Sequence, residues 1–535
     1  MSRKQQLLKR HRRNKRIGLL IALVVLIALG LLVAWWLPLV LAVIGWIAHE
    51  AWFADHLFYS PKDDYQYSFP PFTPQPKVHL SGEQLRLDEG VMLVDDATLI
   101  LAVKVKSSFL GRFFDPRVEL AGGPHPDVQT FERGVNGLRY LNLSGQAQAL
   151  SQGQLRLRGR FCRVSGEPLL WALEQPDYRQ QRVMVIAPHA DDAELAAYGL
   201  YRQAKEAWIV TLTAGEIEAE HYQQMGLNKV EAARLKGRLR AWDSLAVPRW
   251  AGVPQEHCVQ LGYFCLQLAA MQAAPNQPIG SREADLSDTR MFRQLNPFAL
   301  PGDADGAPTW NNLLADLRDV LSRARPDVIV LPHPTLDPHP DHICAQEAVL
   351  EALRGLDYQP TLLGYANHLH DNDRWPMGDS GQGIALPPTF DAGVAMQPLC
   401  LPLSIELQRD KAMALSMMHD LQPPAPFKRR LRRLFQRLLA GRRPSVYGEN
   451  EFFRAAKLVQ RPHRPQAHAF EGFVGKLEIH RTVGPAYSLT RPRLATQERR
   501  RHFEAITGQR LDDLLCEVGK IMGFDVVVRL QLQNL

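Results

Sequence analysis

One long apolar run dominates the start of the hydrophobic pattern. Residues 17–49 contain no Asp, Glu, Lys or Arg, and Glu50 follows them. A helix of about 20 apolar residues crosses a bilayer core, and this run is longer than the apolar region of a cleaved signal peptide. The pattern therefore predicts an uncleaved transmembrane signal anchor over residues 17–48, although Pro38 also allows a helical hairpin.

The charges beside this run indicate its orientation. Residues 1–16 contain eight Lys and Arg residues and no acid, whereas Glu50, Asp55, Asp63 and Asp64 come after the run. By the positive-inside rule, residues 1–16 form a basic cytoplasmic tail and the rest of the chain is exported. In a bacterium this predicts a single-pass inner-membrane protein whose main part lies in the periplasm, with the cytoplasmic side as the alternative.

The next two regions have different patterns. Residues 49–77 are rich in proline and predict a stiff linker. Residues 78–176 contain short runs of alternating apolar and polar positions, separated by Gly, Pro and Asn, which is typical of antiparallel strands. We expect a small antiparallel β domain here. Its role stays open between a spacer, a glycan-binding module and a dimer surface.

Beyond this region the strands are apolar throughout and alternate with helices. Short apolar runs at 183–186, 208–213 and 328–331 predict buried strands, and residues 311–325 place Leu and Val on one helical face. This alternation predicts an α/β fold, a Rossmann-like, doubly wound, mainly parallel sheet. Ligands of such sheets bind beyond the carboxyl ends of the strands.

Composition and charge limit the function classes. The chain is 46% hydrophobic and 22% charged, as expected for a folded protein. The net charge of +7 comes from residues 1–16 and 428–443, which hold eight Lys and Arg residues each and no acid. No nucleic-acid partner is therefore indicated. Six cysteines without a CxxC motif argue against a disulfide scaffold.

The second basic segment, residues 428–443, has the pattern of an amphipathic helix. Leu431, Leu434 and Leu438 belong to one apolar stripe, and cations cover the remaining positions. Such helices bind anionic membrane surfaces. The alternatives are binding of a lipid-linked glycan's phosphates and a docked helix with a solvated basic face. Residues 461–535 are predicted as a C-terminal extension, helical before a closing strand, without an assigned role.

Two polar clusters carry the candidate chemistry, each directly after a predicted strand. They are residues 187–194, which include Pro188-His189-Ala190-Asp191-Asp192, and residues 333–342, which end in His339-Pro340-Asp341-His342. A catalytic zinc ion has three protein ligands plus water, and His189, Asp192 and His342 could supply these ligands. Asp191 would then be free as a general base. Singly, either aspartate could cap the next helix and a histidine could lie on the surface, but the two clusters together favour a metal site.

This pair of motifs resembles the PIG-L deacetylase superfamily, which includes N-acetylglucosaminyl-phosphatidylinositol de-N-acetylases and LmbE-like proteins. The family pattern is a strand, then P-H-P-D-D, and later H-P-D-H. Weaker similarity extends the resemblance over residues 180–460, including the basic helix. Ala190 replaces the usual proline, and Cys265 lies where relatives often have an acid nearby, which leaves sugar contacts at that point in doubt.

The resemblance implies a role for each residue of the site. It implies a divalent metal, Zn²⁺, held by His189, Asp192 and His342. It implies Asp191 as the general base. The remaining assignments are His339 for the oxyanion or the leaving amine, Asp341 to orient the substrate or a histidine, and substrate contacts by Lys236, Arg238 and Asp337.

The expected function is removal of N-acetyl groups from amino sugars of a membrane-associated glycoconjugate, such as lipopolysaccharide or a lipid-linked glycan. The expected partners are this N-acetylated sugar and membrane lipid, contacted through the anchor and the basic helix. The alternatives are a zinc amidase acting on another amino-sugar conjugate and a non-catalytic glycan-binding scaffold. Iron could also occupy such a metal site.

Overall fold

The structure is a computed structural model. It describes residues 3–54, 57–123, 126–174, 176–333, 336–369, 375–390, 397–421, 427–442 and 450–457. The predicted C-terminal extension, residues 461–535, lies outside these ranges.

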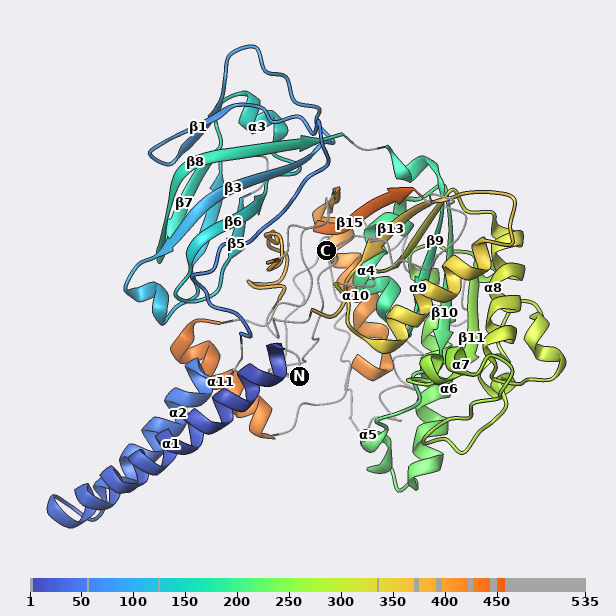
Figure 1. Cartoon of the computed structure of the whole chain (residues 1–535), viewed down its shortest axis with the longest axis horizontal. Coiled ribbons are helices and arrows are strands. Elements are labelled where there is room, and N and C mark those ends of the chain that lie inside the picture. Colours follow the sequence, from blue (N-terminus) through green and yellow to red (C-terminus); the bar gives the residue numbers. More distant parts are fainter. Residues whose placement is uncertain are drawn as a thin grey trace, which may run out of the picture. The chain divides into compact units, whose positions relative to one another are not determined.

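The N-terminal apolar run forms two helices. They are α1 (Arg3–Leu32) and α2 (Leu37–Trp52), which contact each other and lie side by side (Figure 1). Pro38 is in the first turn of α2, where its missing N–H costs no hydrogen bond. Only the stretch Arg12–Leu32 of α1 is long and apolar enough to cross a membrane among the described residues. The single continuous span predicted over residues 17–48 is therefore replaced by two helices.

Residues 78–173 form two antiparallel sheets, which confirms the expected antiparallel strands. The five-stranded sheet has the order β1 (Val78–Ser81), β2 (Gln84–Leu87), β7 (Arg156–Arg160), β4 (Arg117–Ala121) and β5 (Asp127–Thr130). The three-stranded sheet has the order β6 (Asn136–Asn142), β3 (Thr98–Ser107) and β8 (Cys162–Leu173). Leu85 and Val118 from the first sheet share one core with Leu101 and Leu141 from the second. The two sheets therefore form a β sandwich.

A seven-stranded sheet contains the candidate site. Its order is β11 (Cys258–Tyr263), β10 (Glu206–Thr213), β9 (Arg182–Ala187), β12 (Val328–Pro332), β13 (Thr361–Tyr365), β15 (Asn450–Lys457) and β14 (Pro398–Pro402). The first five strands are parallel, and β15 is antiparallel to both of its neighbours. The expected mixed α/β architecture with a parallel sheet is confirmed.

Helices cover both faces of this sheet. Met184 and Ile186 of β9 belong to one core, with α8 (Trp310–Ala324) and α9 (Pro340–Leu353), while Val183 and Val185 belong to another, with α4 (Asp192–Gln203), α6 (Lys229–Trp250) and α10 (Ile405–Met417). Successive side chains of a strand point to opposite faces, so both faces of β9 are apolar. The remaining described α-helices are α3 (Ala147–Ser151), α5 (Glu220–Gln223), α7 (Leu268–Ala273) and α11 (Phe427–Ala440).

Candidate metal centre

The two sequence motifs follow neighbouring parallel strands. β9 and β12 pair directly, with Val185 opposite Val330, so their carboxyl ends lie at one edge of the sheet. The first motif connects β9 to α4, and the second leads into α9 with Pro340 in its first turn. The order of the strands therefore brings together two loops that are about 150 residues apart in the sequence.

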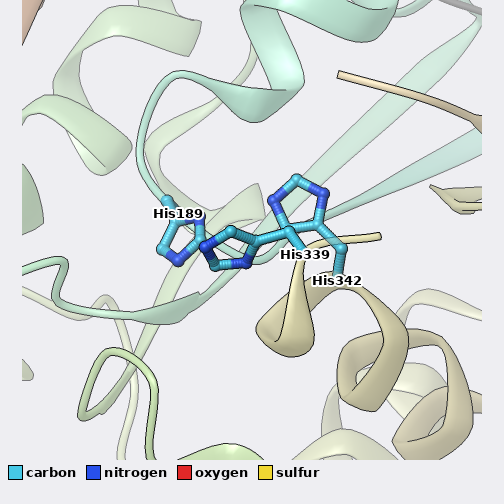
Figure 2. A group of neighbouring side chains, drawn as sticks. All are labelled: His189, His339 and His342. Atoms are coloured by element: carbon cyan, nitrogen blue, oxygen red, sulfur yellow. The ribbon is translucent and has the colours of Figure 1, made fainter. Parts of the chain in front are cut away.

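The three predicted metal ligands converge. Asp192 Oδ2 lies 3.3 Å from His189 Nδ1 and 3.2 Å from His342 Nε2. The ring centroids of the two histidines are 5.4 Å apart, and all three side chains are buried. Figure 2 shows the rings of His189 and His342 gathered with that of His339. The structure thus brings two nitrogens and one oxygen close together, and one group of side chains that could hold a metal ion consists of His189, His339 and His342.

His339 completes this cluster of side chains. Its ring centroid lies 5.0 Å from that of His189 and 4.9 Å from that of His342 (Figure 2). The three histidines each offer a ligand atom within 4.8 Å of the other two. His339 Nδ1 is buried without a hydrogen-bond partner among the described residues. His339 is therefore free to contact a ligand of the site.

Two carboxylates contact ring nitrogens of the candidate ligand histidines. Asp337 Oδ2 lies 2.9 Å from His342 Nδ1 and also accepts the backbone N–H of Asn367. Asp341 Oδ2 lies 3.1 Å from His189 Nε2 and accepts the backbone N–H of Leu266 at 2.7 Å. Such partners fix the ring orientation and tautomer of metal-binding histidines.

These contacts show which groups surround Asp337 and Asp341. Asp337 was expected to contact substrate, but the structure places it against His342, where it is completely buried. Asp341 was expected to orient either the substrate or a histidine, and it contacts His189. Both aspartates thus lie within hydrogen-bond distance of a histidine ring.

The charges of the site favour a cation at its centre. Burial lowers the pKa of His342, but Asp192 and Asp337 more than offset this and raise that pKa to about 10. Burial acts in the same sense on His189, yet Cys265, followed by the hydrogen bonds with Asp192 and Asp341, raises its pKa well above the usual value. These carboxylates therefore stabilise positive charge between the rings, and a metal ion competes with protons for such ligands.

Asp191 lies beside the cluster and has a different partner. Its φ of 103° is outside the region that non-glycine residues usually adopt, which marks a constrained turn between His189 and α4. Asp191 Oδ1 lies 3.4 Å from Arg240 Nη2, and the same nitrogen donates to Ala190 O at 2.6 Å. Burial raises the pKa of Asp191 to about 6, while Arg240 opposes the rise.

The arginine of α6 that lies beside Asp191 is Arg240, two residues after the predicted substrate contact Arg238. Arg238 is exposed on α6, whereas Arg240 is buried and also contacts Asp420 at 2.5 Å. Residues two positions apart on a helix point about 200° apart, so only one of these arginines can face Asp191. Lys236 is buried beside the same acid, since its Nζ lies 3.1 Å from Asp420 Oδ1 and donates to Ile217 O at 2.7 Å.

Sequence reasoning missed the contacts of three further residues at this site. Asn367 Nδ2 donates to Asp192 Oδ1 at 2.7 Å, and Asp420 pairs with Arg240. Cys265 Sγ lies 3.5 Å from His189 Nε2, and the backbone N–H of Cys265 donates to Glu216 Oε2. No motif in the sequence points to Asn367 or Asp420. Only the family resemblance drew attention to Cys265.

The family comparison agrees with the motifs. Residues 184–353 match the PIG-L family, whose description is GlcNAc-PI de-N-acetylase. This range runs from β9 to the end of α9 and includes both polar clusters. The match confirms the predicted resemblance of this segment to the PIG-L family.

Other comparisons add little. No curated protein matches the chain. The chain resembles the crystal structure of GalB, the 4-carboxy-2-hydroxymuconate hydratase from Pseudomonas putida KT2440, with 13% sequence identity and a TM-score of 0.26. That similarity covers 54% of this chain and 100% of the other. It carries no argument about function.

Proposed function

We propose that this protein is a metal-dependent hydrolase that removes N-acetyl groups from amino sugars of a membrane-associated glycoconjugate. The observation that carries the proposal is the convergence of His189, Asp192 and His342 within the PIG-L segment, with Asp191 beside them. The complete set of ligands and base argues against a non-catalytic glycan-binding scaffold. The apolar helix α1 supports a substrate at the membrane.

A zinc ion would be held by His189, Asp192 and His342, since two imidazoles and a carboxylate are common zinc ligands. Iron also accepts this combination of ligands. When bound, the metal would polarise the acetyl carbonyl and make water a better nucleophile. The buried His342 Nε2 fits this role, because it lies 3.2 Å from Asp192 Oδ2, the second proposed ligand atom.

Asp191 acts as the general base. It takes a proton from the attacking water and returns a proton to the departing amine, so that acetate and a free amino sugar are formed. Its raised pKa, about 6, lies close to neutral pH, where a carboxylate is still ionised but is a stronger base than usual. Arg240 holds the carboxylate in place.

His339 stabilises the oxyanion that forms at the acetyl carbon. Burial and the adjacent His189 and His342 lower the pKa of His339 to about 4, so the ring is neutral and donates a hydrogen bond rather than a full charge. Its ring centroid lies 5.0 Å from that of His189 and 4.9 Å from that of His342, which supports a contact with the carbonyl that the proposed metal would polarise.

The test uses the full chain in detergent micelles. Metal content and acetate release from N-acetylglucosamine-containing glycolipids are measured for the parent chain, Asp191→Asn and His189→Ala. We expect Asp191→Asn to keep its metal and lose activity by about 10²–10⁴-fold, the usual contribution of a general base. His189→Ala should lose both metal and activity.

Equal activity and metal content in all three proteins would refute the proposal. Activity on a soluble amino-sugar amide, without activity on any glycolipid, would instead favour the alternative of a zinc amidase on another conjugate.

A further inference from the structure

The N-terminal apolar run closes into a helical hairpin. α1 ends at Leu32 and α2 begins at Leu37, and the two helices run back along each other (Figure 1). A Cβ atom on Gly30 would come within 2.9 Å of Pro38 Cγ, so the glycine allows the close approach at the turn. The run therefore returns to the side from which it starts.

The apolar parts of the two helices have matching lengths. The stretch from Ile17 to Leu32 and the stretch from Leu37 to Trp52 each rise about 22 Å at 1.5 Å per residue. In the antiparallel pair, the C-terminal end of α2 therefore lies at the level of Arg16, the last residue of the basic N-terminal segment. The charged residues at both open ends of the hairpin lie on one side of its apolar part.

The C-terminal end of α2 is hydrogen-bonded to the β sandwich. Trp52 Nε1 donates to Phe113 O at 3.0 Å, and Arg133 Nη1 donates to Trp52 O at 3.2 Å. After α2, the described residues contain no further helix long and apolar enough to cross a membrane. The β sandwich and the metal centre therefore stay on the side where α2 ends.

The basic helix α11 joins the hairpin on that same side. Arg432 Nε donates to Glu50 Oε2 at 2.5 Å, and the rings of Phe435 and Trp46 meet edge to face with centroids 5.7 Å apart. Lys428, Arg430 and Arg437 of α11 are exposed. Leu434 and Leu438 are 47% and 69% exposed.

Lipid is the occupant that fits these surfaces. Leu20, Ile21 and Val24 of α1 are each about 60% exposed, and none of the apolar stretch of α1 is buried by the described protein. This apolar surface continues through α2 to α11, where cations border it. Apolar side chains flanked by Lys and Arg match an acyl layer covered by anionic headgroups.

We propose that α1 and α2 enter the membrane as a hairpin from the cytoplasmic side, with the basic N-terminal segment, α11 and the metal centre all on that side. The positive-inside rule assigns the basic end of α1 to the cytoplasm, and the hairpin carries the rest of the described chain with it. Anionic lipid of the cytoplasmic leaflet attracts such cations. The predicted periplasmic location depended on a single span, so this inference reverses it and goes beyond the proposed function.

Cysteine labelling in a bacterial host tests this topology. Three variants of the full chain, Lys15→Cys, Lys62→Cys and Lys229→Cys, place an exposed thiol before the hairpin, after it, and on α6. The parent chain supplies the background, since its described cysteines are all buried. With a membrane-impermeant maleimide, we expect none of the variants to be labelled above background in intact cells. All three should be labelled several-fold above background after the inner membrane is permeabilised.

Labelling of Lys62→Cys or Lys229→Cys in intact cells would overturn the inference. The pattern that a single span predicts is labelling of these two variants, with Lys15→Cys protected. The result is independent of deacetylase activity, so failure of this proposal is distinguishable from failure of the proposed function.

Discussion

Two buried polar clusters adjoin the same parallel sheet, and they are completed in different ways. Beside β11, Arg293 Nη2 and Tyr263 OH both donate to Asp316 Oδ2, at 2.7 and 2.8 Å, and Gly302 N donates to Oδ1 at 2.7 Å. Beyond β9 and β12, His339 Nδ1 and Asp341 Oδ1 are buried without hydrogen-bond partners among the described residues.

This difference in hydrogen bonding distinguishes the Asp316 cluster, which is complete by itself, from the histidine cluster, which has unpaired atoms. Buried polar groups are nearly always hydrogen-bonded, because an unpaired group pays its full desolvation cost. The cluster around Asp316 meets this requirement with protein groups alone. The histidine cluster does not, and its unpaired atoms lie where the predicted metal ligands converge. An incomplete buried network therefore indicates a ligand.

The largest expected effect on folding comes from breaking the completed cluster. Arg293→Met removes the cation beside buried Asp316, and removing one partner of a buried pair costs about 3–5 kcal/mol. We expect the free energy of unfolding, measured with urea, to fall by this amount. Folded Arg293→Met should still bind one metal ion per chain.

A matched control is Arg323→Ala on α8, which breaks the exposed ion pair with Asp319. That pair should be worth only about 0.3–0.5 kcal/mol. A loss of metal from Arg293→Met while it remains folded would remove the distinction between the two clusters.

A smaller effect is expected from an orienting residue of the incomplete cluster. Asp337→Asn weakens the support behind His342 Nδ1, and such changes typically cost 10–100-fold in metal affinity or activity. We expect metal affinity, measured by competition with a chelator, to fall in this range. If Asp337 contacted substrate instead, as first expected, KM would rise while metal affinity stayed that of the parent.

The smallest effect distinguishes the two arginines of α6. Arg238→Ala should change the rate of acetate release by less than about twofold, because exposed substitutions have small effects. Arg240→Ala should lower kcat by about tenfold or more, since it releases the general base Asp191. The reverse order of effects would restore the arginine assignment made from the sequence.

The sequence predicted the local parts of the site well. Each strand and the loop after it depend on neighbouring residues: an apolar run forms β9, and the motif at His189 follows directly. The antiparallel strands of residues 78–173 and the parallel strands of the larger sheet follow from the same short-range patterns. Asp191, Asp192 and His342 could be named because their motifs are contiguous.

Two features could not be predicted from the sequence. They are which face of α6 points toward the site, and whether the long apolar run turns back on itself. A helical period shows that α6 has two faces, but only packing decides that Arg240 meets Asp191 while Arg238 faces outward. Likewise, residues 17–49 have the composition of a single span, and in the structure they lie in two helices with Gly30 close to Pro38.

Residue types along the chain determined which chemistry is available, since imidazoles and carboxylates in two short motifs are suited to holding a divalent cation. Tertiary structure decided which groups meet. Pairing of β9 with β12 joined loops distant in sequence, and it placed Asp337 and Asp341 behind the histidines. The physical reason is range: backbone and side-chain preferences act over a few residues, whereas contacts between distant segments depend on the packing of the whole sheet.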